Sequence, residues 1–299
     1  MNGQIFYRLS ACLVLLAALA ACDARPGSQI DRRGLLDSLL KDGPKVEGVS
    51  QALLSTATQA EESRNYGRAL QYYKQLIDKY PEDISYKVKY ADNLRRMQKN
   101  EEAIAAYDSV LRLKPRNVSA LEGRGLAYIN KGDFSSASAS LQKVMKIDNK
   151  RWRTLNGVGL LFVAKKMPDE AVAYFNSALK HSSNHPTVLN NIGLNHALQA
   201  EYPQALDALN RASSKVKSKS GERQHIEMNL ALVLGLSGDM DKAEQIAGRH
   251  LQDSALQNNL GFYAHLADDD KLAKAYLNSA LSGSSTFYDR AWQNLENIN

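Results

Sequence analysis

The chain has 299 residues, of which 44% are hydrophobic, and carries a net charge of +6. Basic and acidic residues are interspersed along it without the clustered basic footprint of a nucleic-acid-binding protein, so we expect no nucleic-acid partner. Its two cysteines, Cys12 and Cys22, are too few for the disulfide framework of a small secreted domain.

An apolar run of thirteen residues, from Leu9 to Ala21, follows the basic Arg8 near the N-terminus. A transmembrane helix needs about 20 apolar residues, so this run is too short to span a membrane. A buried N-terminal helix is the alternative, but such a helix would be amphipathic and this run is apolar all round. Its length and flanks predict the core of a signal peptide over residues 1–21.

The run ends in Leu-Ala-Ala followed by Cys22, which resembles the signal of bacterial lipoproteins. That resemblance implies a lipid on Cys22, so the mature chain is expected to be anchored to a membrane on the periplasmic side of the cell envelope. Residues 22–48 are predicted to form a tether, with breakers at Pro26 and Gly27. Within the tether, residues 34–40 could form an apolar helical turn that docks on the first repeat or, alternatively, on a membrane or partner.

From residue 49 onward one pattern recurs, typified by Asn100–Pro115. An alanine follows the start of a helix, and an aromatic or large apolar residue comes four positions later, as Tyr107 follows Ala103. The spacings of the equivalent alanines are 34, 34, 34, 34, 38 and 30. Relative to a period of 34, the fifth spacing contains an insertion of four residues and the sixth a deletion of four. These alanines are Ala69, Ala103, Ala137, Ala171, Ala205, Ala243 and Ala273.

A second small residue lies twelve positions before each alanine. Two antiparallel helices joined by a short turn can approach closely only where a side chain on each is nearly absent. The two columns are therefore predicted to mark the closest contact within a helix pair. The second column is Ala57, Ala91, Gly125, Gly159, Gly193, Ala231 and Gly261.

A 34-residue period of helix–turn–helix units is the signature of tetratricopeptide repeats (TPR), and residues 49–285 resemble that family. The resemblance implies an all-α fold, a right-handed superhelical solenoid of about seven repeats. The chain departs from the family at the first consensus position, usually Trp, where repeats six and seven carry Glu227 and Gln257.

Two further segments complete the expected domain. Lys215–Arg223 contains the four inserted residues and is predicted to be an exposed turn. Residues 286–299 are predicted to form a C-terminal capping helix, because apolar residues recur there at helical spacing. These are Phe287, Ala291, Trp292, Leu295 and Ile298.

Nothing in the sequence supports catalysis. The six histidines form no metal-binding motif, and neither a nucleophile elbow nor a phosphate-binding loop occurs. We therefore expect no enzyme activity, no catalytic residue and no cofactor.

Asparagines recur instead at two adjacent positions of the first helix in repeats four to seven. In the TPR family these positions line the inner groove, so the resemblance implies a groove that binds a protein partner. Asparagine is a poor helix former, and its amide suits the backbone of an extended ligand; hydrogen bonding between repeats is the alternative. The asparagines are Asn156, Asn190, Asn191, Asn229, Asn258 and Asn259, and further candidates by position are Arg95, Arg96, Glu122, Leu160, Leu194 and Phe262.

Together these features predict a lipid-anchored, protein-binding scaffold. It resembles the TPR lipoproteins of pilus and secretion machines, in particular that of the tight-adherence (Tad/Flp) pilus, which implies a pilotin-like role toward an outer-membrane secretin or another pilus component. An adaptor for peptidoglycan enzymes or for an outer-membrane assembly complex is the alternative. Asp23 after the lipidated cysteine is typical of inner-membrane retention in enteric bacteria, whereas the pilotin resemblance favours the outer membrane.

Overall fold

The computed structural model describes residues 46–218, 220–284 and 289–298. The predicted signal peptide, Cys22 and residues 22–45 of the predicted tether lie outside the described residues. No described helix is both long enough and apolar enough to cross a membrane.

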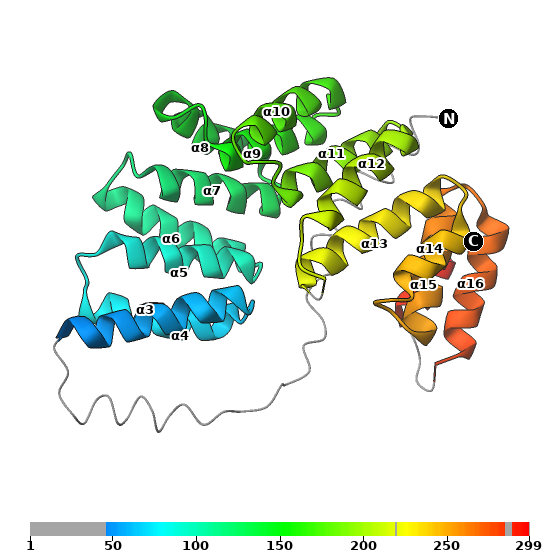
Figure 1. The fold of residues 1–299 in the computed structure, drawn as a ribbon, viewed down its shortest axis with the longest axis horizontal. Coiled ribbons are helices and arrows are strands. Elements are labelled where there is room, and N and C mark those ends of the chain that lie inside the picture. The colour runs from blue at the N-terminus through cyan, green and yellow to red at the C-terminus, as the bar shows by residue number, and fades with distance from the viewer. Residues whose placement is uncertain (1–45, 219, 285–288, 299) are drawn as a thin grey trace. The chain divides into compact units, whose positions relative to one another are not determined.

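The described residues form fifteen α-helices and no strand (Figure 1). The helices belong to two compact units that adjoin in the sequence between Asn149 and Lys150. The first unit contains three helix pairs: α3 (Val46–Glu62), α4 (Tyr66–Lys79), α5 (Ile84–Arg96), α6 (Asn100–Leu113), α7 (Val118–Lys131) and α8 (Phe134–Ile147).

The second unit contains four helix pairs and a single terminal helix. Each pair is one repeat, so the predicted all-α solenoid of seven helix–turn–helix repeats is confirmed. The helices are α9 (Trp152–Ala164), α10 (Pro168–Lys180), α11 (Pro186–Leu198), α12 (Tyr202–Ser214), α13 (Gly221–Leu236), α14 (Met240–Ala247), α15 (Asp253–Leu266), α16 (Asp270–Ser282) and α17 (Asp289–Glu296).

The two small-residue columns lie at the helix contacts, as expected, and the structure shows what each small residue accommodates. A Cβ atom added at Gly159 would lie 2.4 Å from Cε1 of the Phe175 ring. At Gly193 it would lie 2.7 Å from Cγ of Leu209 and 3.0 Å from the backbone oxygen of Ala205. The first helix of a repeat therefore needs a small residue because a large side chain and the backbone of the second helix both press against it.

The irregular spacings of 38 and 30 residues have a simple structural origin. Helix α13 has 16 residues, whereas α11 before it has 13, and it begins at Gly221. Gly221 to Arg223 therefore belong to the first turn of α13, and the expected exposed turn is confined to Lys215–Ser220. Helix α14 has only 8 residues, whereas α12 has 13, so the second helix of repeat six is shortened while the first is lengthened.

One turn conformation recurs between the two helices of every repeat. A residue with positive φ follows the first helix each time, and five of the seven are not glycine. A left-handed conformation costs a residue with a side chain about 1–2 kcal/mol, so these turns are strained except where glycine occurs. The residues are Arg64 (φ 57°), Gln98 (62°), Gly132 (81°), Lys166 (60°), Ala200 (59°), Gly238 (89°) and Asp268 (64°).

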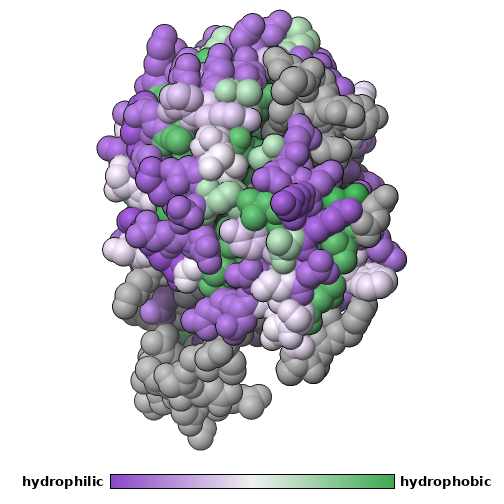
Figure 2. Space-filling model, turned by 90° about the vertical axis from the view of Figure 1, so that its right-hand side faces the viewer, coloured by the Kyte–Doolittle hydropathy of each residue, from purple (hydrophilic) through white to green (hydrophobic). Residues whose placement is uncertain are grey.

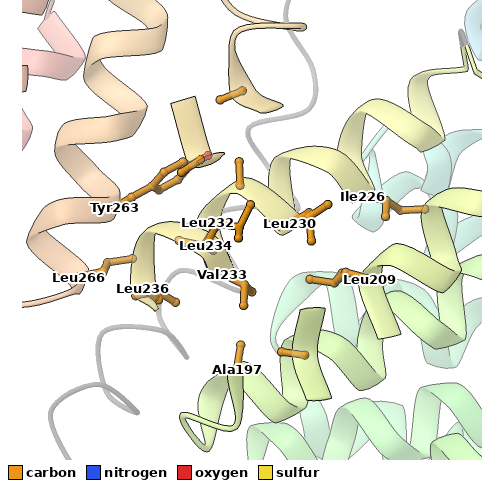
Figure 3. Packing of buried hydrophobic residues seen from close by; sticks show 14 of the residues in the cluster. Ala197, Leu209, Ile226, Leu230, Leu232, Val233, Leu234, Leu236, Tyr263 and Leu266 are labelled. Carbon is orange, nitrogen blue, oxygen red and sulfur yellow. The ribbon is translucent and has the colours of Figure 1, made fainter. Parts of the chain in front are cut away.

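The core of the second unit is centred on α13. Seven consecutive residues of this helix, from Leu230 to Leu236, are buried, so it is apolar around its whole circumference. Figure 3 shows Leu209 of α12 and Ala197 of α11 on one side of α13 and Tyr263 of α15 on the other. In the view of Figure 2, polar residues cover most of the surface and apolar residues appear in small separate patches.

The terminal helix α17 covers the last repeat, as the predicted cap would. Ala291 is fully buried, and Leu295 and Ile298 pack against Leu277 and Ala280 of α16. Trp292, however, is 44% exposed and is not a core residue of the cap. Phe287 lies outside the described residues.

Ala200→Gly is expected to stabilise the fold because it relieves a left-handed alanine. The gain should be about 0.5–1 kcal/mol, the strain relief less the extra entropy of an unfolded glycine. Chemical denaturation of the full chain measures the free energy of unfolding. The matched control is Ala267→Gly, which changes an exposed alanine at an ordinary φ of −83° one residue before the corresponding turn. Ala267→Gly should destabilise the protein, and equal effects of the two changes would contradict the strained-turn account.

Candidate partner-binding face

The first helices of consecutive repeats contact one another in the second unit, as α9 contacts α11, α11 contacts α13, α13 contacts α15, and α15 contacts α17. We call the surface formed by these five helices the A-helix face. All six asparagines predicted as groove residues lie on four of them, α9, α11, α13 and α15.

The asparagines are joined between repeats by side-chain hydrogen bonds, which we call asparagine rungs. Asn191 donates through Nδ2 to Oδ1 of Asn156 at 2.9 Å, and Asn229 donates to Oδ1 of Asn190 at 2.8 Å. In each rung the donor belongs to the later repeat and lies one position further along its helix. Adjacent asparagines of α11 therefore link that helix to both neighbouring repeats.

A third rung ties the terminal helix to repeat seven. Nδ2 of Asn294 in α17 lies 2.9 Å from Oδ1 of Asn258 in α15. The sequence reasoning missed Asn294, although it lies 36 positions after Asn258, close to the 35 that separate Asn191 from Asn156. The terminal helix thus behaves as the first helix of an eighth repeat.

The series has one gap, between repeats six and seven. The acceptor position of repeat six holds Met228, and its expected donor is Asn259 of repeat seven. Asn259 instead donates through Nδ2 to the backbone oxygen of Ala255 in its own helix at 2.9 Å. Asn259 is therefore the one predicted groove asparagine whose amide nitrogen is bonded only within its own helix.

The rungs supply the inter-repeat hydrogen bonds that the sequence left open as the alternative to ligand binding. The rungs leave part of the hydrogen-bonding capacity of each amide unused. An amide has two N–H groups and two oxygen lone pairs, and a rung uses one N–H of the donor and one lone pair of the acceptor. Asn156 and Asn258 are only 6% and 7% exposed, whereas Asn190, Asn191, Asn229 and Asn259 are partly exposed. Ligand binding through these four remains a prediction.

The other candidate residues have different surroundings. Leu160, Leu194 and Phe262 are partly buried on α9, α11 and α15. In the first unit, Glu122 is only 4% exposed and so presents little of its carboxylate to a ligand. The guanidinium of Arg96 lies 5.5 Å from the ring centroid of Tyr66.

Arg95 lies beside a buried hydrogen bond of the first unit. The Tyr107 hydroxyl donates to Oδ1 of Asp92 at 2.5 Å, and burial raises the pKa of this tyrosine, so the ring stays neutral. Arg95 contributes a nearby positive charge to this pair. Within the described residues, no group of three or more histidine, cysteine, aspartate or glutamate side chains is arranged to hold a metal ion.

Three family models match the chain: a TPR repeat over residues 91–132 and tetratricopeptide repeats over residues 51–83 and 118–151. All but the last two matched residues lie in the first unit. The helix pairs of the second unit repeat the same columns and the same turn. The fold is a TPR solenoid.

Solved structures agree with this fold. A tetratricopeptide repeat protein from Parabacteroides merdae matches with a TM-score of 0.55 at 16% identity, covering 83% of this chain and 98% of its own. The type IV pilus biogenesis factor PilW matches with a TM-score of 0.57 at 18% identity, covering 73% and 98%. The Cut9–Hcn1 complex matches with a TM-score of 0.63 at 15% identity, covering 89% of this chain and 52% of that one. No curated protein matches the chain.

Repeat six departs from the TPR pattern by burying a charged network at its first consensus position. Glu227 is 6% exposed, and its carboxylate accepts from Nε of Arg223 at 2.9 Å and contacts Nε2 of His250 at 2.6 Å. The Ser213 hydroxyl of α12 lies 3.4 Å from the same carboxylate. The network connects α12, α13 and the residues after α14 at a position where repeats one, three, four and five have a leucine.

The charge of Glu227 is stabilised by this network. Burial acts to raise its pKa, but the hydrogen bonds from His250 and Arg223 and their charges outweigh burial, so the pKa is lowered from its ordinary value. A carboxyl whose pKa is lower in the folded state contributes stability above its unfolded pKa. That stability is lost as the pH falls through the folded value.

Glu227→Gln is therefore expected to change how stability depends on pH. At neutral pH it should cost about 1–3 kcal/mol, because Arg223 and His250 lose the charge they face. Below about pH 4.5 the cost should shrink, since the wild-type carboxyl is then being protonated as well. Urea unfolding from about pH 7 to pH 3 measures both effects. Glu82→Gln, which changes an exposed carboxylate of the first unit, should leave the profile unchanged; parallel profiles for wild type and Glu227→Gln would contradict the network.

Proposed function

We propose that the chain is a non-enzymatic scaffold, anchored by lipid in the cell envelope, that binds a segment of a partner protein. Through this binding it assists assembly of a pilus or secretion machine, in the manner of a pilotin for a Tad/Flp secretin. The observation that carries the proposal is the A-helix face, where partly exposed amides recur from repeat to repeat beside partly buried apolar side chains.

The chemistry of this face suits a polypeptide. Asn190, Asn191 and Asn229 can offer both donors and acceptors to an extended backbone, while Leu194 and Phe262 provide apolar contact about one turn away on the same face. A partner segment that lies across several repeats would meet the same pair of groups at each one. This repetition favours an extended or helical protein segment over a compact small molecule.

The assignment to a pilus machine rests on two supports. PilW, described as a type IV pilus biogenesis factor, has the same fold. The sequence adds the lipoprotein-like Leu-Ala-Ala-Cys22 segment and the resemblance to the Tad/Flp pilus lipoprotein. We favour the outer membrane for the anchor because pilotins act there, although Asp23 is the residue that directs enteric lipoproteins to the inner membrane.

Cys22→Ser is expected to release the protein from the membrane or leave it unprocessed, because serine cannot form the thioether that carries the lipid. Cell fractionation and gel mobility of the full chain measure the outcome. Cys12→Ser is the matched control, since it changes the other cysteine within the predicted signal peptide and should leave fractionation unchanged. A Cys22→Ser protein that stays in membranes with unchanged mobility would remove the anchor from the proposal.

The partner-binding claim is tested by two asparagine variants with different structural roles. Asn191→Ala breaks a rung, whereas Asn259→Ala breaks only a bond within its own helix. If the amides bind ligand, each change should weaken binding about 2–13-fold, the equivalent of one hydrogen bond of about 0.5–1.5 kcal/mol. The full chain is used to capture partners from envelope membranes, and calorimetry then gives the affinity for the partner identified by mass spectrometry.

Circular dichroism and thermal unfolding are measured first. Asn191→Ala alone should lower stability if its rung is structural, because it leaves the oxygen of the buried Asn156 without this partner. Asn176→Ala, which changes an exposed asparagine of α10, is the control for both readouts. Capture of a secretin or another pilus component supports the proposal, whereas capture of wall enzymes alone, or affinities unchanged in both variants, overturns it.

A further inference from the structure

A hollow opens where the terminal helix meets the last repeat. Its volume is about 140 Å³, and α15, α16 and the end of the chain from α17 onward line it. Four apolar side chains form most of the lining: Phe262, Leu266, Leu277 and Ile298. Three polar groups complete it: His265, Asn294 and Asn297.

The hollow lies beside α17, which the described residues do not pair with a second helix. Elsewhere in the second unit, each first helix packs against the second helix of its own repeat. Helix α17 has eight residues, and the described residues contain no second helix after it. Ala291 and Leu295 of α17, together with Ile298 just after it, cover α16. Leu277, which is fully buried, and Leu266, which is 3% exposed, therefore line a recess that no described side chain fills.

Two hydrogen bonds hold the polar side of the hollow in place. The rung from Asn294 to Asn258 fixes α17 against α15 at 2.9 Å. Nδ1 of His265 lies 2.6 Å from Oδ1 of Asp270, which orients the ring beside the recess. A preorganised recess loses little conformational entropy when it is filled.

The size of the hollow indicates what it can take. Pockets for metabolites and cofactors commonly measure about 300–1,000 Å³, so this recess is too small for such ligands. Its walls are mainly apolar, and covering them with an apolar side chain in place of solvent is favourable. One leucine- or phenylalanine-sized side chain matches both its volume and its lining.

The charge at the rim adds a second requirement. Three consecutive exposed aspartates, Asp268 to Asp270, follow Leu266 after one alanine, and Asp270 contacts the lining residue His265. A segment that inserts an apolar side chain here brings its flanking residues toward these carboxylates. Lysine or arginine beside the inserted side chain would be favoured over acidic residues.

We infer that this hollow is an anchor pocket for a single apolar side chain, flanked by basic residues, of a protein segment that continues along the A-helix face. The inference rests on the proposed partner binding and specifies its chemistry at the C-terminal end of that face. Phe262 connects the two, because it is both a groove candidate and a wall of the pocket.

The probe for the test is an acetylated, amidated peptide of sequence Gly-Lys-Leu-Lys-Gly, titrated into the full chain with labelled isoleucine and leucine methyl groups. Saturable NMR shifts are expected at Ile298 and Leu266, and not at Ile147 of the first unit. A peptide with serine in place of leucine should produce no such shifts. Equal shifts with both peptides would mean that charge alone attracts them, and absent shifts would mean that the pocket is no anchor; either result overturns the inference.

Ile298→Phe should fill the pocket and weaken the leucine peptide at least about tenfold. The matched control is Ile147→Phe, which makes the same change at a site that is 39% exposed and should leave affinity unchanged. If Ile298→Phe disturbs the fold, Phe262→Ala replaces it: the enlarged recess should then prefer a peptide with tryptophan at the centre. Unchanged peptide preference in Phe262→Ala would overturn the inference.

The outcome is distinguishable from that of the proposed function. If a pilus partner binds and responds to Asn259→Ala while Ile298→Phe has no effect on either partner or peptide, only the pocket inference fails. If the peptide binds as expected but no envelope partner depends on the A-helix face, the pocket stands as a site and the proposed function fails.

Discussion

The close approach of two helices at one small residue is the constraint on which each repeat depends. In repeat four the ring of Phe175 occupies the space that a side chain at Gly159 would need. Overpacking of this kind typically costs about 1–3 kcal/mol, which is a large part of the stability of an ordinary domain. Because the repeats of the second unit meet the same constraint, their first helices can stack into one continuous face.

On that face, the same asparagine amides that stabilise the contacts between repeats are the groups proposed to bind a partner. An amide in mid-helix has more hydrogen-bonding capacity than one neighbour can satisfy, so the asparagines can tie repeats together and still face a partner. The donor of each rung belongs to the later repeat. Of the three acceptors, Asn156 and Asn258 are buried, whereas Asn190 is partly exposed. The partly exposed members and the apolar recess beside Phe262 are therefore the parts of the face most available to a ligand.

Sequence periodicity was sufficient to predict the helix pairs, because the small columns report a contact that recurs at fixed spacing. It did not predict the left-handed turn residues, since Lys166 and Ala200 lack the glycine that normally marks such a turn. It placed the insertion in a loop, whereas part of it extends α13, because helix ends depend on packing as well as on local sequence. Periodicity could not predict the partners of Glu227 either. His250 lies 23 positions away, in a segment without a repeating pattern.

The gap at Met228 has a consequence for temperature. A repeat stack is stabilised by each repeat and by the junctions between neighbours. Asparagine rungs add to apolar burial at three junctions: the two that join α11 to its neighbouring repeats and the one between α15 and α17. The junction between repeats six and seven has no rung. It relies on apolar contacts such as those of Tyr263 and Leu266 with α13. Because apolar burial weakens on cooling, this junction loses the largest fraction of its strength in the cold among the four junctions compared.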